Sequence, residues 1–211
     1  YGSGKSTIVR VTREYPEILQ RYRRDKRRTY RPPLDHSDLA EEEGTAPPEW
    51  ISLLQAVIDV EPGRAAFPEY EQAVEALLTA VFYPSLTNPQ VQRSIHEGRK
   101  RIDITYTNAA TQGFFYWLAL NYSAAHIFVE CKNYGGDPGN PELDQLAGRF
   151  SRSRGRCGLL VCRSISDKEL FMRRCRDTAT DDRGYIIPLD DADLARLVDQ
   201  RTADYDSLRF D

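Results

Sequence analysis

The chain has 211 residues, of which 40% are hydrophobic and 29% charged, and its formal net charge is −3. This composition predicts a soluble protein with a real core, organised as one domain of ordinary size plus an appendage. The negative net charge argues against broad electrostatic capture of nucleic acid, although a local basic surface is compatible with it. No stretch is long and apolar enough to span a bilayer, so we expect no membrane partner, and no signal peptide is visible, although the first residue is not methionine.

The four cysteines form no CxxC pair; they are Cys131, Cys157, Cys162 and Cys175. Three of them lie in or beside apolar segments, which is typical of small buried side chains in a reducing compartment. We therefore expect a cytoplasmic protein. A zinc site is the less favoured interpretation of this spacing.

The first residues contain the end of a phosphate-binding loop signature, Gly4-Lys5-Ser6, within Gly2 to Thr7. In such loops backbone amides cradle phosphate and the lysine reaches the outer phosphate oxygens. A phosphate-binding loop leads into a helix, whereas residues 8–12 are rich in β-branched side chains and Pro16 follows soon afterwards. The favoured interpretation is a Gly-rich turn before a strand, with nucleotide binding as the alternative.

Residues 17–28 predict a helix crowded with arginine, and a solvated helix face is favoured over a phosphate-contacting one. Residues 31–48 contain two Pro-Pro pairs and an acidic run, a composition that marks a linker. We place a boundary near residue 60. The chain then consists of an N-terminal extension, residues 1–60, and a main domain, residues 61–211.

An amphipathic helix is predicted over residues 67–82, because apolar side chains recur there at helical spacing. Glu71 lies at the margin of this apolar stripe and could approach the core, whereas Glu75 lies well outside it. A solvated glutamate and a functional one are equally favoured for Glu71. The stripe consists of Phe67, Tyr70, Val74, Leu77, Leu78 and Val81.

A loop is expected over residues 84–89, followed by two short strands between residues 91 and 107 that turn at Glu97-Gly98-Arg99. In the second strand Asp103 points to the face opposite Ile102 and Ile104. Aspartate is unfavourable inside a strand. Asp103 therefore requires a functional or structural reason.

A short helix is expected over residues 113–121, although its aromatic side chains leave a strand possible. The next strand, within residues 124–134, places Phe128, Glu130 and Lys132 on one face. A carboxylate and an ammonium group are not readily buried without partners. A metal-dependent active site is the sharpest explanation, and an ion pair at a strand end is the alternative.

A further helix is predicted to start with Asn140 as its N-cap and Pro141 at its first helical position. It has an apolar stripe on one side, and Glu142, Gln145 and Arg149 lie together on another face. A basic loop with three arginines follows, then a short apolar strand over residues 158–163 that is predicted to be interior and parallel. The remaining segments predict a helix over residues 167–176, an edge strand containing Pro188 over residues 185–189, and a closing helix over residues 190–200.

Carboxylates on neighbouring strands favour Mg²⁺, which typically takes one or two of them plus waters and phosphate oxygens. Such an ion acidifies a bound water and neutralises charge on phosphoryl oxygens, the help that phosphodiester hydrolysis needs. A lysine beside the metal can orient the attacking water and stabilise the developing charge. Asp103, Glu130 and Lys132 are therefore compatible with a metal-dependent nuclease, and their spacing alone leaves a structural ion pair between Glu130 and Lys132 as the alternative.

Three segments resemble the PD-(D/E)XK nuclease superfamily, and most closely its restriction-endonuclease-like, Mrr-like branch. They are residues 98–104, residues 129–134 and residues 142–150, and Tyr70-Glu71 is similar to the first helix of that branch. The resemblance covers about residues 66–190. It implies an α/β fold with a central mixed sheet flanked by helices, and cleavage of DNA that depends on Mg²⁺ or Mn²⁺.

The resemblance also implies a role for each matching residue. Asp103 and Glu130 would be metal ligands, Lys132 the catalytic lysine, Gln145 a supporting group on the following helix and Glu71 a further acid. Ile102 stands where the family name has proline. By analogy the protein would act in restriction or defence against foreign DNA.

Two rival functions stay open: a catalytically inactive module of the same fold that binds DNA or assembles complexes, and a nucleotide-binding protein that uses Gly2 to Thr7. A homodimer is plausible, because cutting both strands often uses two sites, and partner subunits of a defence system are a further possibility. The three histidines, His36, His96 and His126, show no pattern and are interpreted as structural or surface groups.

Overall fold

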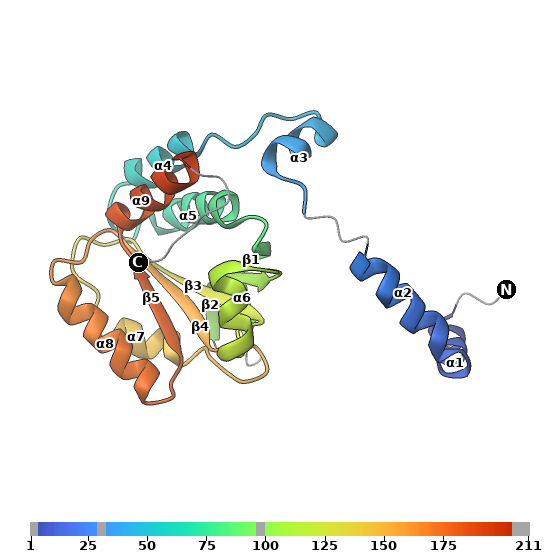
Figure 1. Cartoon of the computed structure of the whole chain (residues 1–211). Coiled ribbons are helices and arrows are strands. Elements are labelled where there is room, and N and C mark those ends of the chain that lie inside the picture. Colours follow the sequence, from blue (N-terminus) through green and yellow to red (C-terminus); the bar gives the residue numbers. More distant parts are fainter. Residues whose placement is uncertain (1–3, 29–32, 96–99, 204–211) are drawn as a thin grey trace. The chain divides into compact units, whose positions relative to one another are not determined.

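The computed structural model describes residues 4–28, 33–95 and 100–203. Its contacts divide the chain into two compact units, Tyr1–Asp35 and His36–Asp211. The smaller unit contains α1 (Lys5–Glu14) and α2 (Pro16–Arg28), shown in Figure 1. The strand predicted after residue 8 is therefore wrong. β-Branched residues disfavour a helix by only a few tenths of a kcal/mol each, roughly, and Pro16 occupies the first position of a second helix, where proline is tolerated.

The larger unit begins before the predicted boundary near residue 60. It includes α3 (His36–Glu43) and α4 (Trp50–Asp59), although the composition of residues 31–48 had predicted a linker. The Nε2 atom of His36 lies 2.8 Å from the carbonyl oxygen of Ala80, and its ring lies 5.0 Å from that of Tyr83. α4 in turn packs against α5 and α9. These tertiary contacts attach a proline-rich segment to the core, which local composition cannot reveal.

The larger unit is built on a five-stranded mixed sheet with the order β1-β2-β3-β4-β5. β1 pairs with β2 and β2 with β3 in antiparallel fashion, whereas β3, β4 and β5 are parallel. The predicted α/β fold with a mixed sheet is thus confirmed. The strands are β1 (Leu86–Ile95), β2 (Lys100–Asn108), β3 (His126–Lys132), β4 (Cys157–Cys162) and β5 (Tyr185–Leu189).

The two edge strands both contain proline. β5 lies at one edge with Pro188, as predicted, because an edge strand can lack a ladder donor. β1 lies at the other edge and already begins at Leu86, so the loop predicted over residues 84–89 is too long. The register of β1 shifts between Thr87 and Gln90, which accommodates Pro89.

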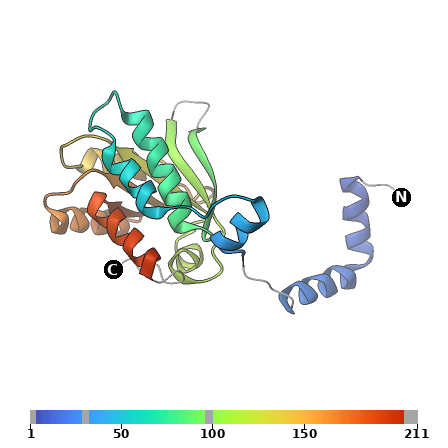
Figure 2. The ribbon, with the colours of Figure 1, turned by 90° about the horizontal axis from the view of Figure 1, so that it is seen from above.

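Helices cover both faces of the sheet, as Figures 1 and 2 show. α5 (Phe67–Phe82) lies with α4 and α9 (Asp191–Ala203) on one face. α7 (Asn140–Ala147) and α8 (Lys168–Thr180) lie on the other. The predicted apolar stripe of α5 is buried between Tyr70 and Val81, and every residue of β4 is buried, as expected for an interior parallel strand.

The remaining helix, α6 (Gly113–Asn121), joins β2 to β3, so the helix rather than the strand is correct for this aromatic segment. All four cysteines are free and buried, in agreement with the expectation from their apolar surroundings. Within residues 4–28, 33–95 and 100–203, no helix combines the length and the apolar character that crossing a membrane requires. The turn predicted at Glu97-Gly98-Arg99 and His96 lie outside the described residues.

Candidate active site

Asp103 on β2 is fixed against the neighbouring strand β3. Its Oδ2 atom accepts a hydrogen bond of 2.8 Å from the backbone N–H of Cys131, and the residue is only 7% exposed. The antiparallel register pairs Ile104 with Val129, so Asp103 comes beside Glu130. Asp103, a residue type that is unfavourable in a strand, is therefore held beside Glu130, the other acid predicted to bind a metal.

Glu130, Lys132 and Gln145 form a compact polar cluster at the end of β3. Lys132 donates from Nζ to Glu130 Oε1 over 2.9 Å and to Gln145 Oε1 over 3.1 Å. Gln145 on α7 also donates from Nε2 to Glu130 Oε1. The side chain of Glu130 is 2% exposed and that of Lys132 15% exposed, so the ion pair is sheltered from solvent. Strand alternation puts Glu130 and Lys132 on one face, and α7 brings Gln145 to them.

Glu71 enters the cluster from α5. It is buried, and its Oε2 atom accepts a hydrogen bond of 3.3 Å from Nε2 of Gln92 on β1. Gln92 in turn accepts 3.2 Å from the Nη1 atom of Arg101. Gln92 has a backbone φ of 54°, an uncommon value for a residue other than glycine. Glu71 is therefore not a solvated side chain on the surface of α5, which was one of the two interpretations that the sequence left open.

All three carboxyl groups have a raised pKa, and burial is the largest cause for each of them. Burial raises the pKa of Glu71, and the charges of Asp103 and Glu130 raise it further. Burial and then Asp103 raise the pKa of Glu130 against the opposing effect of Lys132. Burial also raises the pKa of Asp103, although the Cys131 amide and nearby cations oppose it. Like charges in a poorly solvated place are costly, and a bound cation would relieve that cost.

The Oε2 atom of Glu130 is buried and has no hydrogen-bond partner. A buried acceptor without a partner costs free energy unless a ligand or a water satisfies it. Glu130 and Asp103 supply the one or two carboxylates that Mg²⁺ or Mn²⁺ typically takes from a protein. In the part of the chain that the structure describes, no group of three or more His, Cys, Asp and Glu side chains is placed so that it could hold a metal ion, so the protein would supply two carboxylates at most.

The structure thus brings together all five residues predicted from the sequence, Glu71, Asp103, Glu130, Lys132 and Gln145. It adds two whose charges or hydrogen bonds act on the carboxylates, Gln92 and Arg149. Sequence reasoning missed Gln92, because the polar side chain of an edge strand is ordinarily solvated. Arg149 was noticed only as a neighbour of Gln145 on the face of a helix.

The loop between β3 and α7 is also hydrogen-bonded. Tyr134 donates from its hydroxyl to Glu142 Oε1 over 2.7 Å, and the Gly139 N–H donates to Glu142 Oε2 over 2.7 Å. Gly139 is therefore the residue that precedes the first turn of α7, and Asn140, predicted as the cap, is its first helical residue. This arrangement fixes the start of the helix that carries Gln145.

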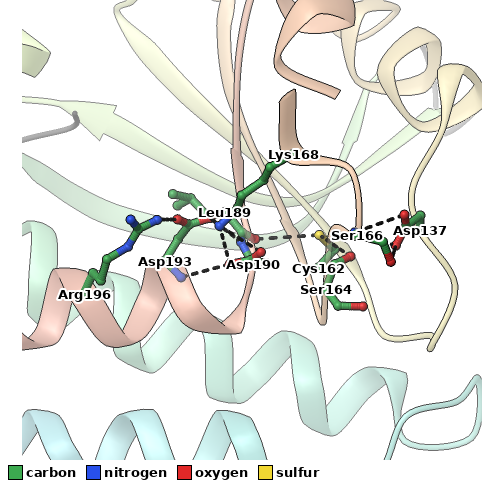
Figure 3. Close-up of polar contacts among 9 residues, drawn as sticks. All are labelled: Asp137, Cys162, Ser164, Ser166, Lys168, Leu189, Asp190, Asp193 and Arg196. Atoms are coloured by element: carbon green, nitrogen blue, oxygen red, sulfur yellow. Dashed lines mark hydrogen bonds and ion pairs between the residues drawn. The ribbon is translucent and has the colours of Figure 1, made fainter. Parts of the chain in front are cut away.

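A second polar cluster lies at the carboxyl ends of β4 and β5 and is drawn in Figure 3. Lys168 Nζ lies 2.9 Å from Asp190 Oδ2 and 2.8 Å from Asp193 Oδ2. Asp137 in the loop after β3 accepts hydrogen bonds from the N–H and hydroxyl of Ser166. These contacts join the starts of α8 and α9 and the loops between them, so we interpret this cluster as structural.

Two other groups of residues noted in the sequence are also placed. α1 begins at Lys5 with Gly4 before it, so the helix that a phosphate-binding loop requires is present where a strand was expected. His36 has a structural contact to α5 through Ala80, and His126 lies half-buried at the start of β3. The structure gives neither histidine a place among the residues of the carboxylate cluster.

We compared the chain with protein-family models, with curated proteins and with solved structures, and none of them matches it.

Proposed function

We propose that the protein is a metal-dependent deoxyribonuclease that hydrolyses DNA phosphodiester bonds at the cluster of Glu71, Asp103, Glu130 and Lys132. The observation that carries the proposal is the convergence of three buried carboxylates, each with a raised pKa, beside a sheltered lysine. A purely structural ion pair would need one carboxylate for one lysine. An excess of buried acids is typical of a site that holds a cation and works on an anionic substrate.

Asp103 and Glu130 would hold Mg²⁺ or Mn²⁺. The unsatisfied Oε2 atom of Glu130 fits this role, because a buried lone pair there has no protein donor. When bound, the ion would polarise the phosphoryl oxygens and lower the pKa of a coordinated water.

Lys132 would contact the reacting groups. Its ammonium is held by Glu130 Oε1 and Gln145 Oε1, and a primary ammonium offers three donor hydrogens. With two used inside the cluster, one is left to donate to an attacking water or to a phosphoryl oxygen. Gln145 would position the lysine. Glu71, connected to Arg101 through Gln92, would be a further acid at the edge of the site.

We propose DNA as the substrate, and a role in restriction or defence, by analogy with the family that residues 66–190 resemble. Cleavage of both strands would favour a homodimer or partner subunits of a defence system. The four buried free cysteines support a reducing, cytoplasmic location.

The test is cleavage of supercoiled and linear DNA in the presence of Mg²⁺ or Mn²⁺, with a parallel reaction in EDTA. We expect nicked and linear products that require the metal. DNA that stays intact with either metal, together with the absence of Mn²⁺ binding in calorimetry, would refute the proposal and favour the inactive DNA-binding or assembly module.

Nucleotide binding at Gly2 to Thr7 is a second candidate function. The observation that favours it is the start of α1 at Lys5, directly after Gly4. It predicts that the full chain binds ATP with Mg²⁺ and that Lys5→Ala abolishes this binding. Equal affinities of the two proteins for ATP would exclude it.

A further inference from the structure

Arg149 lies in the turn that ends α7, immediately beyond the helix that carries Gln145. Its backbone N–H donates to the carbonyl oxygen of Leu146 over 2.9 Å, so this turn is hydrogen-bonded to the last turn of α7. The residue is half-buried. Its Nε atom is buried and has no hydrogen-bond partner, and its guanidinium forms no ion pair within residues 4–28, 33–95 and 100–203.

Several other arginines near α7 have protein partners. Arg156 is hydrogen-bonded to Asp182, and Arg183 forms an ion pair of 2.6 Å with Asp144. Arg154 donates to the carbonyl oxygen of Arg149 over 3.3 Å, which fixes the backbone at Arg149. In the basic segment after α7, Arg154 and Arg156 therefore have protein partners, whereas the guanidinium of Arg149 has none among the described residues.

Arg149 also lies close enough to the carboxylate cluster to act on it. Its charge lowers the pKa of both Asp103 and Glu130, against the larger effect of burial. Gln145, one helical turn earlier, is in direct contact with Glu130 and Lys132. An amide on α7 and a guanidinium in the turn that follows it are thus both near enough to the carboxylates to interact with them.

A half-buried guanidinium without an anionic partner is costly, and a ligand that supplies the anion would remove that cost. Carboxylates that hold a metal ion would not be available to pair with it. The anion that the proposed reaction brings is a phosphodiester. A guanidinium binds phosphate through two parallel N–H donors, a geometry that a lysine cannot reproduce.

We propose that Arg149 binds the phosphate of the DNA strand that is being cleaved and stabilises the charge that develops on its oxygens. This inference rests on the proposed nuclease function and adds a substrate-binding residue to it. Lys132 and Arg149 would then contact the phosphate group from β3 and from the end of α7, respectively.

The test compares wild type with Arg149→Gln, Arg149→Lys and the matched control Arg152→Gln, which removes an exposed arginine from the same segment. We would measure single-turnover cleavage at saturating duplex DNA with Mn²⁺, the Mn²⁺ affinity, and the melting temperature. We expect Arg149→Gln to slow cleavage by about 100-fold, the typical effect of removing one donor to a developing oxyanion. Metal affinity and melting temperature should stay near those of wild type, Arg149→Lys should recover part of the rate, and Arg152→Gln should cleave at the wild-type rate.

A second readout does not depend on cleavage. On the Lys132→Ala background we would measure binding of a labelled duplex with Mg²⁺ over a range of salt concentrations. Loss of one phosphate contact should reduce the slope of log Kobs against log salt concentration by about 0.9 for Arg149→Gln. This inference alone would be overturned if the wild type cleaved DNA and Arg149→Gln cleaved it at the same rate. It would also be overturned if weaker Mn²⁺ binding or unfolding explained the slower cleavage by Arg149→Gln. If the wild type bound DNA without cleaving it, a slope reduced by about 0.9 in Arg149→Gln would support the inference and an unchanged slope would overturn it. A wild type that neither bound nor cleaved DNA would overturn both proposals.

Discussion

The backbone N–H of Cys131 donates a hydrogen bond of 2.8 Å to Asp103 Oδ2, which ties the acid of β2 to the strand that carries Glu130 and Lys132. Because the donor is a main-chain group, any residue except proline could supply it at position 131. The relationship depends on strand register rather than on a particular side chain. This hydrogen bond holds Asp103 beside Glu130 before any ligand binds, so the cost of burying both carboxylates is already present in the metal-free protein.

The metal-free protein should become more stable as the pH falls through the raised pKa values of the cluster. A carboxyl group with a folded-state pKa above its unfolded value binds protons more tightly in the folded state, so its contribution to stability rises as pH falls toward about 4. Glu71, Asp103 and Glu130 all have such raised values. Denaturant unfolding in EDTA should show that the stability of wild type, relative to Asp103→Asn/Glu130→Gln, increases from pH 7.5 to pH 5. A relative stability that stays flat or declines over this range would contradict the electrostatic account.

Divalent metal should reverse part of this cost at neutral pH. A ligand that binds only the folded state stabilises it by RT ln(1 + [L]/Kd), about 2.7 kcal/mol at a concentration of 100 Kd. We expect Mn²⁺ to raise the melting temperature of wild type but not of Asp103→Asn/Glu130→Gln. Equal shifts in both proteins would place the metal elsewhere.

Gln92 offers a test that separates a side-chain role from backbone strain. Its φ of 54° suits glycine better than alanine, so Gln92→Gly should be more stable than Gln92→Ala by about 1 kcal/mol. Both variants lose the side chain that bridges Glu71 and Arg101, and both should therefore cleave DNA more slowly by a similar factor, about 10-fold for loss of the hydrogen bond to Glu71. If Gln92→Gly kept full activity, the side chain of Gln92 would have no role in cleavage, and position 92 would matter only for its backbone conformation.

The start of α7 should contribute to stability through Glu142. Its carboxylate accepts hydrogen bonds from the Tyr134 hydroxyl and the Gly139 N–H. Glu142→Ala should therefore lower the free energy of unfolding by about 1 kcal/mol, as loss of a helix cap does. Glu169→Ala is the matched control, because Glu169 is exposed and forms an ion pair with Arg173 on its own helix, and its effect should stay within about 0.5 kcal/mol. Equal effects of the two substitutions would show that Glu142 does not act as a cap.

Local patterns predicted the strands and helices that carry the site well. The apolar stripe of α5, the alternation around Glu130 and the Pro188 edge strand all appear as expected. The sequence did not predict α1, α3 or the early start of β1. β-Branched and proline-rich residues locally favour other structures, and here helix packing and a register shift outweigh those preferences.

Some residues of the candidate site could likewise be predicted from the sequence, and others could not. Asp103, Glu130 and Lys132 could be predicted because a charged residue at an inward strand position is itself unusual. Glu71 was undecided, since its place depends on how α5 approaches the β1 edge. Gln92 could not be assigned from sequence, because its role depends on Glu71, which lies 21 positions earlier in the chain. Arg149 could not be assigned either, because its role depends on a buried Nε atom that has no hydrogen-bond partner, which only the structure reveals.

The measurement that tests the central claim most directly is metal-dependent cleavage of DNA by wild type, Lys132→Ala and Lys168→Ala. Lys168 is the matched control, since it is also held between carboxylates but belongs to the structural cluster of Asp190 and Asp193. We predict that wild type and Lys168→Ala cleave in Mg²⁺ or Mn²⁺ and not in EDTA, and that Lys132→Ala binds the metal and does not cleave. Cleavage by Lys132→Ala at the wild-type rate, or cleavage that persists in EDTA, would contradict the account.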